Sequence, residues 1–221
     1  MRNTCVILLC SKSAATQEYT SGCTGQHLYS EGEYIMEQRE MALSPTRDKP
    51  SSNGRLSKEM AVYELLEKLE IPYMRLDHEV TATVEDCHNV DRILGIHICK
   101  NLFLCNAQKT DFYLLMMPGD KKFKTKELSA QIHSARLSFA GPEYMDEFLN
   151  ISPGSVSVMG LMNDDNRRVR LLIDQDVLQD EYVGCHPCVN TASLKIKTDD
   201  ILNKFLPYVE HDYTVVELVG E

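Results

Sequence analysis

Two short stretches of this sequence carry the residue types best suited to chemistry. The first is GCHPCVNTAS, residues 184–193, which puts a histidine, a glycine and several small polar groups into one turn. The second is CKNLFL, residues 99–104, which puts Lys100 and Asn101 at the start of an apolar run typical of a buried strand. Neither stretch has a local use for its polar groups. We therefore expect Lys100 and His186 to share one pocket.

Each of these residues also has a purely structural interpretation. A lysine at the head of a buried strand can simply extend its ammonium to the surface. Its compact charge also suits a phosphate or a carbonyl oxygen, and Asn101 beside it adds a donor and an acceptor. His186 has no evident carboxylate partner, so a structural histidine and a catalytic one both stay open.

Glycines and small polar residues extend the list of candidates. Gly154 and Ser155 follow a proline, where they form either an ordinary turn or a place at which a ligand can approach the backbone. Gly184 precedes the histidine by two positions, and Asn190 can brace the same turn.

Lysine is concentrated in one place within an acidic chain. The net charge is −10, and residues 1–55 carry six Lys/Arg and six Asp/Glu, which leaves 17 and 27 for the rest. Such a body repels a phosphate backbone over most of its surface, so extended binding along nucleic acid is not expected. The exception is a run of four lysines, which is either a solvated face or the place where a phosphate binds: Lys121, Lys122, Lys124 and Lys126.

The eight cysteines suggest neither disulfides nor a metal. The first residues have no secretory pattern, and no stretch approaches the roughly 20 apolar residues of a membrane span, so we expect a cytoplasmic protein with reduced thiols. Cys185 and Cys188 form a CxxC, but a zinc site needs a second pair, and a thioredoxin-like dithiol needs an early strand before it. No cofactor and no metal is predicted.

Known catalytic motifs are also missing. The sequence contains no glycine-rich phosphate loop and no G-x-S-x-G elbow. Phosphoryl transfer on a P-loop and hydrolysis through a covalent serine are therefore not supported.

The chain divides into a tail and one domain. Residues 1–55 are rich in Ser, Thr, Gly and Gln and lack sustained periodicity, so they are interpreted as a disordered or loosely attached tail. Residues 56–221 are long enough for one packed domain. Helices are predicted at 57–69, up to about 94, up to 132, at 142–149 and at 198–208. Strands are predicted at 73–78, 100–106, 112–117, 137–140, 154–162, 169–173 and 213–219.

The order of these elements predicts the fold class. Strands and helices alternate irregularly and several neighbouring strands form hairpins, which favours an α+β fold over a doubly wound parallel sheet. We expect a mixed, partly closed sheet or barrel with packed helices. The runs at 100–106 and 112–117 are almost entirely apolar, which indicates strands buried on both faces.

Together these motifs resemble a known family. Residues 57–221 are similar to the prolyl-tRNA-synthetase-associated editing domain superfamily, which includes YbaK and free-standing aminoacyl-tRNA deacylases. The resemblance rests on the order and spacing of four motifs: KNLFL at 100–104, LSFA at 137–140, PGSV at 153–156, and HP with NTA from His186 onward. Lysine followed by asparagine before Leu-Phe-Leu resembles the alanyl-specific, PrdX-like members.

The resemblance implies a function. Such proteins remove alanine from mischarged tRNA(Pro) by hydrolysing the ester. It implies that Lys100 positions the 3′-terminal adenosine or its phosphate, that Asn101 supports it, and that the loops at Gly154 and at residues 184–186 line the aminoacyl pocket. The acceptor end of tRNA(Pro) and prolyl-tRNA synthetase are the implied partners.

Other functions stay open. Many relatives have proline where this chain has Val158, so the preferred amino acid could be cysteine or serine instead of alanine. A non-catalytic module that binds tRNA or the synthetase would share the fold. A thiol or zinc protein built on Cys185 and Cys188 would differ, because replacing both cysteines would abolish its function.

Overall fold

The computed structural model describes residues 45–80 and 84–220, with side chains left undescribed at 84–88. These residues belong to one compact unit, residues 43–221. Most of the predicted tail, residues 1–44, lies outside the described residues. Within the predicted tail, residues 45–55 are described. Thr46 and Arg75 exchange two backbone hydrogen bonds of 2.8 and 2.7 Å, so this part of the segment contacts the domain.

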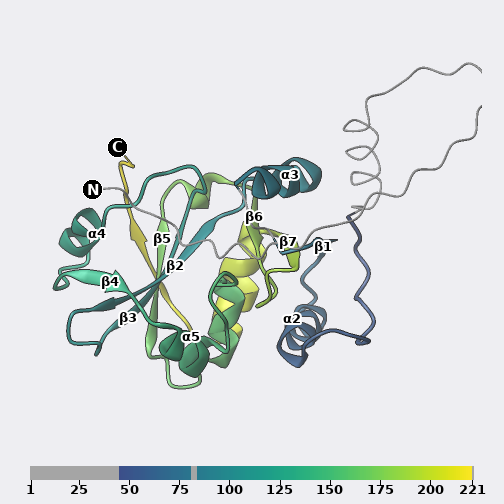
Figure 1. Cartoon of the computed structure of the whole chain (residues 1–221), viewed down its shortest axis with the longest axis horizontal. Helices are drawn as coiled ribbons and strands as arrows, with labels where there is room; N and C mark the ends of the chain where they lie inside the picture. Colours follow the sequence, from purple (N-terminus) through teal and green to yellow (C-terminus); the bar gives the residue numbers. More distant parts are fainter. Residues whose placement is uncertain (1–44, 81–83, 221) are drawn as a thin grey trace, which may run out of the picture. The chain divides into compact units, whose positions relative to one another are not determined.

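The elements follow the predicted order, except that the strands at residues 182–185 and 192–197 were not predicted and that no strand forms at 154–162 (Figure 1). In chain order they are α2 (Ser57–Lys68), β1 (Tyr73–Asp77), α3 (Val84–Leu94), β2 (Lys100–Asn106), β3 (Phe112–Met117), α4 (Thr125–Gln131), β4 (Leu137–Phe139), α5 (Pro142–Leu149), η1 (Val158–Asn163), β5 (Val169–Asp174), η2 (Val177–Gln179), β6 (Tyr182–Cys185), β7 (Ala192–Lys197), α6 (Thr198–Asp200), η3 (Ile201–Phe205), α7 (Leu206–Tyr208) and β8 (Tyr213–Val216). The predicted helix at 198–208 is therefore continuous, with a π-helical turn in its middle.

The strands form two sheets, which confirms the predicted α+β class with mixed strand directions. One sheet has the order β1-β7-β6 and is antiparallel. The other has the order β4-β2-β3-β5-β8. In it, β2 pairs antiparallel with β4 and β3, and β5 pairs parallel with β3 and β8. A single parallel bridge, Ile98 to Gly184, connects the segment before β2 with β6 of the first sheet.

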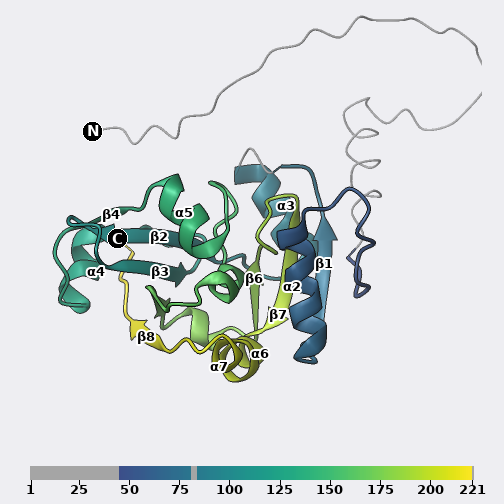
Figure 2. The same ribbon diagram turned by 90° about the horizontal axis from the view of Figure 1, so that it is seen from below.

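The five-stranded sheet is covered on both faces, as the apolar runs predict. All six residues of β3 are buried. Alternate residues of β2 and β3 pack on one side with α2, α5 and the C-terminal helix, and the others pack on the opposite side with α4. Figure 2 shows α5 lying over β2 and β3, while α4 and β4 lie at the opposite end of the sheet from β1 and α2.

One predicted strand is wrong. Residues 154–162 form no strand. They contain a turn and the 3₁₀ helix η1, whose N-terminus is capped by the Ser157 side chain, which accepts a hydrogen bond from Met159 N. Gly154 has φ +89°, which interrupts an extended run, and Gly160 packs so closely that a methyl group there would stand 2.4 Å from Ile151 Cδ1. A buried apolar run alone does not distinguish a strand from a tightly packed helical turn.

No helix in the described ranges is long and apolar enough to cross a membrane.

Candidate functional site

The connection between β6 and β7 holds the candidate histidine. We call residues 184–193 the His186 turn. His186 follows the last residue of β6, and its Nδ1 lies 2.8 Å from the carbonyl oxygen of Ala192, the first residue of β7. A carbonyl oxygen can only accept, so Nδ1 carries the proton and donates it. In the neutral ring, Nε2 is then left with its lone pair, and it makes no hydrogen bond within the described part of the chain.

The surroundings keep this imidazole neutral. Burial lowers the pKa of His186 below its ordinary value of 6.5, and the nearby His78 lowers it further, while the bond to Ala192 opposes both effects. The backbone of the turn is held as well, because Ser157 Oγ donates to the His186 carbonyl at 2.5 Å. His186 therefore offers an oriented lone pair that can accept a proton from water.

His78 is a neighbour that sequence analysis did not select. Its ring centroid lies 6.2 Å from that of His186. Its Nδ1 contacts the Glu79 carbonyl at 2.8 Å, and its Nε2 lies 2.9 Å from Oγ of the buried Ser193. The only sequence signal for His78 is its place just after β1. The last residue of β1 pairs with the first residue of β7, so the end of β1 lies at the His186 turn.

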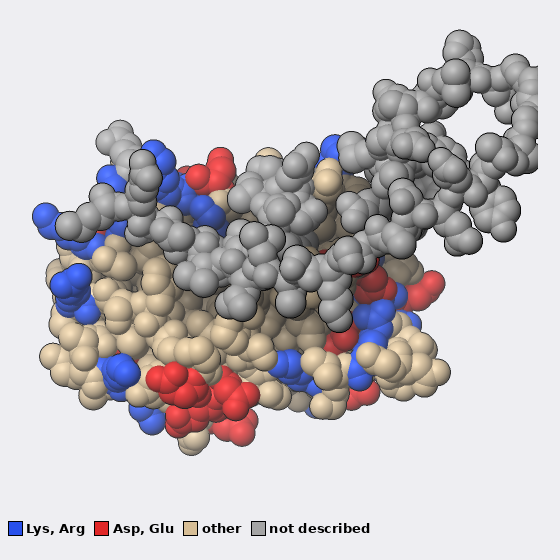
Figure 3. Space-filling view, in the orientation of Figure 1, with Lys and Arg blue, Asp and Glu red and all other residues tan. Residues whose placement is uncertain are grey.

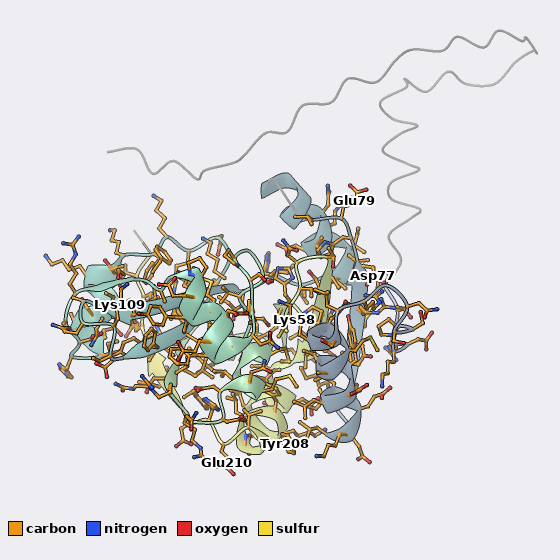
Figure 4. All side chains as sticks on the ribbon, turned by 60° about the horizontal axis from the view of Figure 1, so that its bottom comes forward. Lys58, Asp77, Glu79, Lys109, Tyr208 and Glu210 are labelled. Atoms are coloured by element: carbon orange, nitrogen blue, oxygen red, sulfur yellow. The ribbon has the colours of Figure 1, made fainter. Side chains whose placement is uncertain are left out.

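Gly154 and Asn190 lie next to each other, as a shared pocket wall requires. A methyl group added to Gly154 would stand 3.4 Å from Asn190 Nδ2. The turn is closed by Ser155 Oγ, which donates to the Ser152 carbonyl at 2.9 Å. Lys58, labelled in Figure 4, extends from α2 and reaches Ser152 Oγ at 3.3 Å. The loop at Gly154 is thus fixed between α2 and the His186 turn.

Lys100 and Asn101 lie at the first two positions of β2, where the two sheets meet. The Lys100 ammonium is exposed and donates to the Lys121 carbonyl at 3.0 Å. Asn101 Nδ2 donates to the Cys99 carbonyl at 3.2 Å, and its buried Oδ1 accepts no hydrogen bond within the described residues. An unpaired buried oxygen costs free energy, so Asn101 carries an unused acceptor beside the candidate site.

The bridge between Ile98 and Gly184 aligns the segments that lead to Lys100 and to His186. The two segments run parallel, with Cys99 N donating to the Gly184 carbonyl at 3.3 Å, and each candidate lies two residues beyond the bridged pair. Gly184 allows this approach, because a methyl group there would stand 2.8 Å from the Ile98 side chain. The two candidate side chains form no hydrogen bond with each other, and each is held by a backbone carbonyl instead.

The four lysines of residues 121–126, which we call the lysine segment, have two different environments. The Lys121 ammonium contacts both carboxylate oxygens of the buried Asp174 at 2.9 Å and Asp176 at 2.7 Å. The other three are exposed and form no ion pair within the described part of the chain: Lys122, Lys124 and Lys126. Three lysines rather than four are free to meet a phosphate.

Three thiols of the described residues are poorly suited to a reactive site. Cys99, Cys185 and Cys188 are buried and free. Burial raises the pKa of Cys99 and of Cys188 to about 12, and it raises the pKa of Cys185 as well. Because the thiolate is the nucleophile and the metal ligand, these residues are poor candidates for either task. Among the described residues, no group of three or more His, Cys, Asp or Glu side chains is placed to hold a metal ion.

Comparison with known proteins assigns this arrangement to a family. The family model of the aminoacyl-tRNA editing domain matches residues 78–204, a span that contains Lys100, Gly154 and His186. The chain belongs to the aminoacyl-tRNA editing domain family. As a member, it is an aminoacyl-tRNA deacylase, a hydrolase that acts on an ester bond.

Several relatives of this editing domain share most of its length. The chain is 30% identical over 158 residues to the prolyl-tRNA editing protein ProX of Acetoanaerobium sticklandii, covering 72% of this chain and 96% of that protein. It is 28% identical over 151 residues to prolyl-tRNA synthetase associated domain-containing protein 1 of Danio rerio, covering 67% and 80%. A solved structure described as a candidate trans-editing enzyme for prolyl-tRNA synthetase has a TM-score of 0.57 at 16% identity, covering 75% and 98%, which shows a shared fold.

Proposed function

We propose that this editing domain hydrolyses mischarged tRNA(Pro) in trans, with alanine as the amino acid it removes, and that a positioned water performs the attack. The observation that carries the proposal is the His186 imidazole, whose Nδ1 is committed to Ala192 and whose Nε2 lone pair is free. The name of the relative ProX supports tRNA(Pro) as the substrate.

Editing by a second site follows from the physics of selection. A synthetic site built for proline cannot reject a smaller amino acid by more than about 1–3 kcal/mol per missing methylene. A separate pocket that admits alanine and sterically excludes proline supplies the missing discrimination. This division of labour explains why an editing site separate from the synthetic site is needed.

The reaction needs little from the protein besides placement. An aminoacyl ester is already activated, so holding it against an oriented water provides much of the acceleration. We assign His186 to orienting that water and accepting its proton. We assign Lys100 to the terminal adenosine or its phosphate, and Asn101, the next residue of β2, to supporting it.

The remaining candidates form the pocket and its approach. Gly154, Ser155, Gly184 and Asn190 are proposed to line the aminoacyl side, and Lys122, Lys124 and Lys126 to meet the acceptor-end phosphates. Lys121 is left out of this set because its charge is already compensated by two carboxylates. Val158, which stands where many relatives have proline, is fully buried in the main core, so any influence on amino acid preference is exerted through packing.

We place the reaction in the cytoplasm, with prolyl-tRNA synthetase as the source of the mischarged substrate. We further propose that residues 56–221 form the editing domain and that residues 1–55 are a separate tail. A truncated chain that begins at residue 56 and retains the full deacylation rate supports this division, whereas a reduced rate would show that the segment paired with Arg75 through Thr46 belongs to the domain.

The decisive experiment is deacylation of Ala-tRNA(Pro), with Pro-, Cys- and Ser-tRNA(Pro) beside it. We expect rapid loss of alanine only, abolished in Lys100→Ala and retained in the matched control Lys197→Ala, an exposed lysine at the end of β7. If Cys- or Ser-tRNA(Pro) is hydrolysed instead, the chain is still a deacylase of this family but prefers a different amino acid. No turnover of any substrate, with tRNA binding retained, would favour the non-catalytic binding module.

A further inference from the structure

Phe139 is the most exposed aromatic side chain in the described part of the chain, at 62%. It ends β4, which has three residues and forms one edge of the five-stranded sheet. A large aromatic ring left open to water on an edge strand gains nothing from the core. It is therefore a candidate contact for a partner.

The strand register places this ring on the same face of the sheet as Lys100. Phe139 stands directly opposite Leu104 in the antiparallel pair of β4 and β2, so the two side chains point to the same side. Side chains alternate along a strand, so Lys100 and Leu102 share that side with Leu104. The same face carries α4 and the residues that precede it.

A second aromatic residue connects the two positions. The Phe123 ring meets Phe139 edge to face, with centroids 6.3 Å apart. Phe123 lies two residues after Lys121, whose carbonyl holds the Lys100 ammonium. Lys100 is thus connected to Phe139 by a hydrogen bond to Lys121, by the chain from Lys121 to Phe123, and by the ring contact of Phe123. Phe123 supports one side of the exposed ring.

The charge around this path is opposite to that of the whole chain. Residues 118–140 carry five Lys/Arg and two Asp/Glu, which is a net +3 in a chain of net −10. The cations that flank the path are exposed and, among the described residues, form no ion pair: Lys122, Lys124, Lys126 and Arg136. Figure 3 shows Lys and Arg side chains gathered at the end of the molecule that carries α4 and β4 in Figure 1.

We propose that Phe139 is a stacking platform for an unpaired base of the tRNA acceptor end, with the exposed lysines holding the adjoining phosphates. The inference rests on the proposed function, which places the terminal adenosine at Lys100. Stacked aromatic rings beside cations are the general means by which proteins hold single-stranded nucleic acid without reading its sequence. The 3′ end of an acceptor stem is single-stranded, and a strand that runs from Phe139 to Lys100 would stay on this one face of the sheet.

The test measures the KM and the saturating rate of deacylation of Ala-tRNA(Pro) by the full chain. Phe139→Ala is expected to raise KM about 5- to 150-fold, the range for one stacked base, and to leave the saturating rate unchanged. Phe139→Tyr should restore the parent KM, whereas Phe139→Leu should not, because leucine keeps apolar area without a flat ring. The matched control is Val215→Ala, at an exposed apolar position on β8, the other edge strand of the same sheet.

Each other outcome rejects the inference in a recognisable way. An unchanged KM in Phe139→Ala, in an active and folded protein, rejects the stacking contact alone. If Phe139→Leu restores the parent KM as well as Phe139→Tyr does, the contact needs apolar area and not a flat ring, which identifies a surface for protein association. A lowered sedimentation coefficient in Phe139→Ala identifies the same kind of surface. Absence of turnover by the parent chain rejects the proposed function itself, and the stacking contact with it.

Discussion

The His186 turn and the lysine segment are both short connections that carry candidate substrate contacts, and the domain holds them in different ways. In the His186 turn, the imidazole and its backbone are fixed by Ala192 and by Ser157 in largely buried surroundings. In the lysine segment, three ammonium groups stand free in water. Fixed, desolvated groups suit the orientation of a reacting ester, and solvated charges suit the attraction of a phosphate.

Lys121 belongs to neither description. It is adjacent in sequence to an exposed lysine, yet its ammonium compensates the fully buried Asp174. The carbonyl of the same residue holds the Lys100 ammonium. Neighbouring lysines can therefore have a structural task or be free to bind a phosphate, depending on whether the fold brings a carboxylate to them.

The largest effect is expected for His186→Ala. A positioned general base contributes about 10²- to 10⁴-fold to a rate, so the saturating deacylation rate should fall by that factor. The control is His133→Ala, since His133 is exposed and lies just beyond α4, far along the chain from the His186 turn. Single-turnover deacylation measures both variants. Equal rates for the two would show that His186 has only a structural role.

The rate should also depend on pH through the same ring. Burial lowers the pKa of His186 below 6.5, so the neutral form that accepts a proton persists to more acidic pH than in a free histidine. The enzymatic rate, corrected for spontaneous ester hydrolysis, should stay level as pH falls through 6.5 and decline only below it. A midpoint above 6.5 would contradict the neutral imidazole.

Lys121→Met should mainly reduce stability. It leaves the buried Asp174 carboxylate without its partner, and breaking a buried pair costs about 3–5 kcal/mol. Lys122→Met, at the exposed neighbouring position, should change the free energy of unfolding by no more than about 0.5 kcal/mol. Urea unfolding compares them, and equal stabilities would remove the distinction between the two lysines.

The three exposed lysines should govern salt dependence. Replacing Lys122, Lys124 and Lys126 by glutamine removes about three phosphate contacts, each worth a slope of roughly −0.7 for a single strand. The slope of log affinity for tRNA against log salt concentration should therefore become shallower by about 2. An unchanged slope would place the phosphates elsewhere on the domain.

The smallest effect is expected at the loop that faces the His186 turn. Gly154 has φ +89°, and a side chain in a left-handed conformation costs about 1–2 kcal/mol, so Gly154→Ala should lose that much stability. Because the added methyl group would also approach Asn190, KM for Ala-tRNA(Pro) should rise. The control is Gly54→Ala, compared by thermal unfolding and by KM. Gly54 has φ +76° and nothing within 4 Å of an added methyl group, so this variant should lose similar stability and leave KM unchanged.

Much of the fold is predictable from local patterns. The hairpin of β2 and β3 follows from two apolar runs separated by a polar turn, and α5 begins with a proline at its first position as expected. The segment 154–162 was predicted wrongly because its apolar residues are buried by a tight helical turn, which periodicity alone does not reveal. The ion pairs of Lys121 and the position of His78 beside His186 are not predictable for a similar reason, since their partners are distant in sequence.

The sequence by itself determined the α+β class, the editing-domain family and the candidates Lys100, Gly154 and His186. These depend on residue types, on order and on spacing, which a chain displays before it folds. Only the tertiary structure decided that the Nδ1 atom of His186 is committed to Ala192, that Asp174 neutralises Lys121, and that Phe139 shares a face with Lys100. Those facts depend on strand register and on burial, because hydrogen bonds and desolvation act between atoms that only the fold brings together.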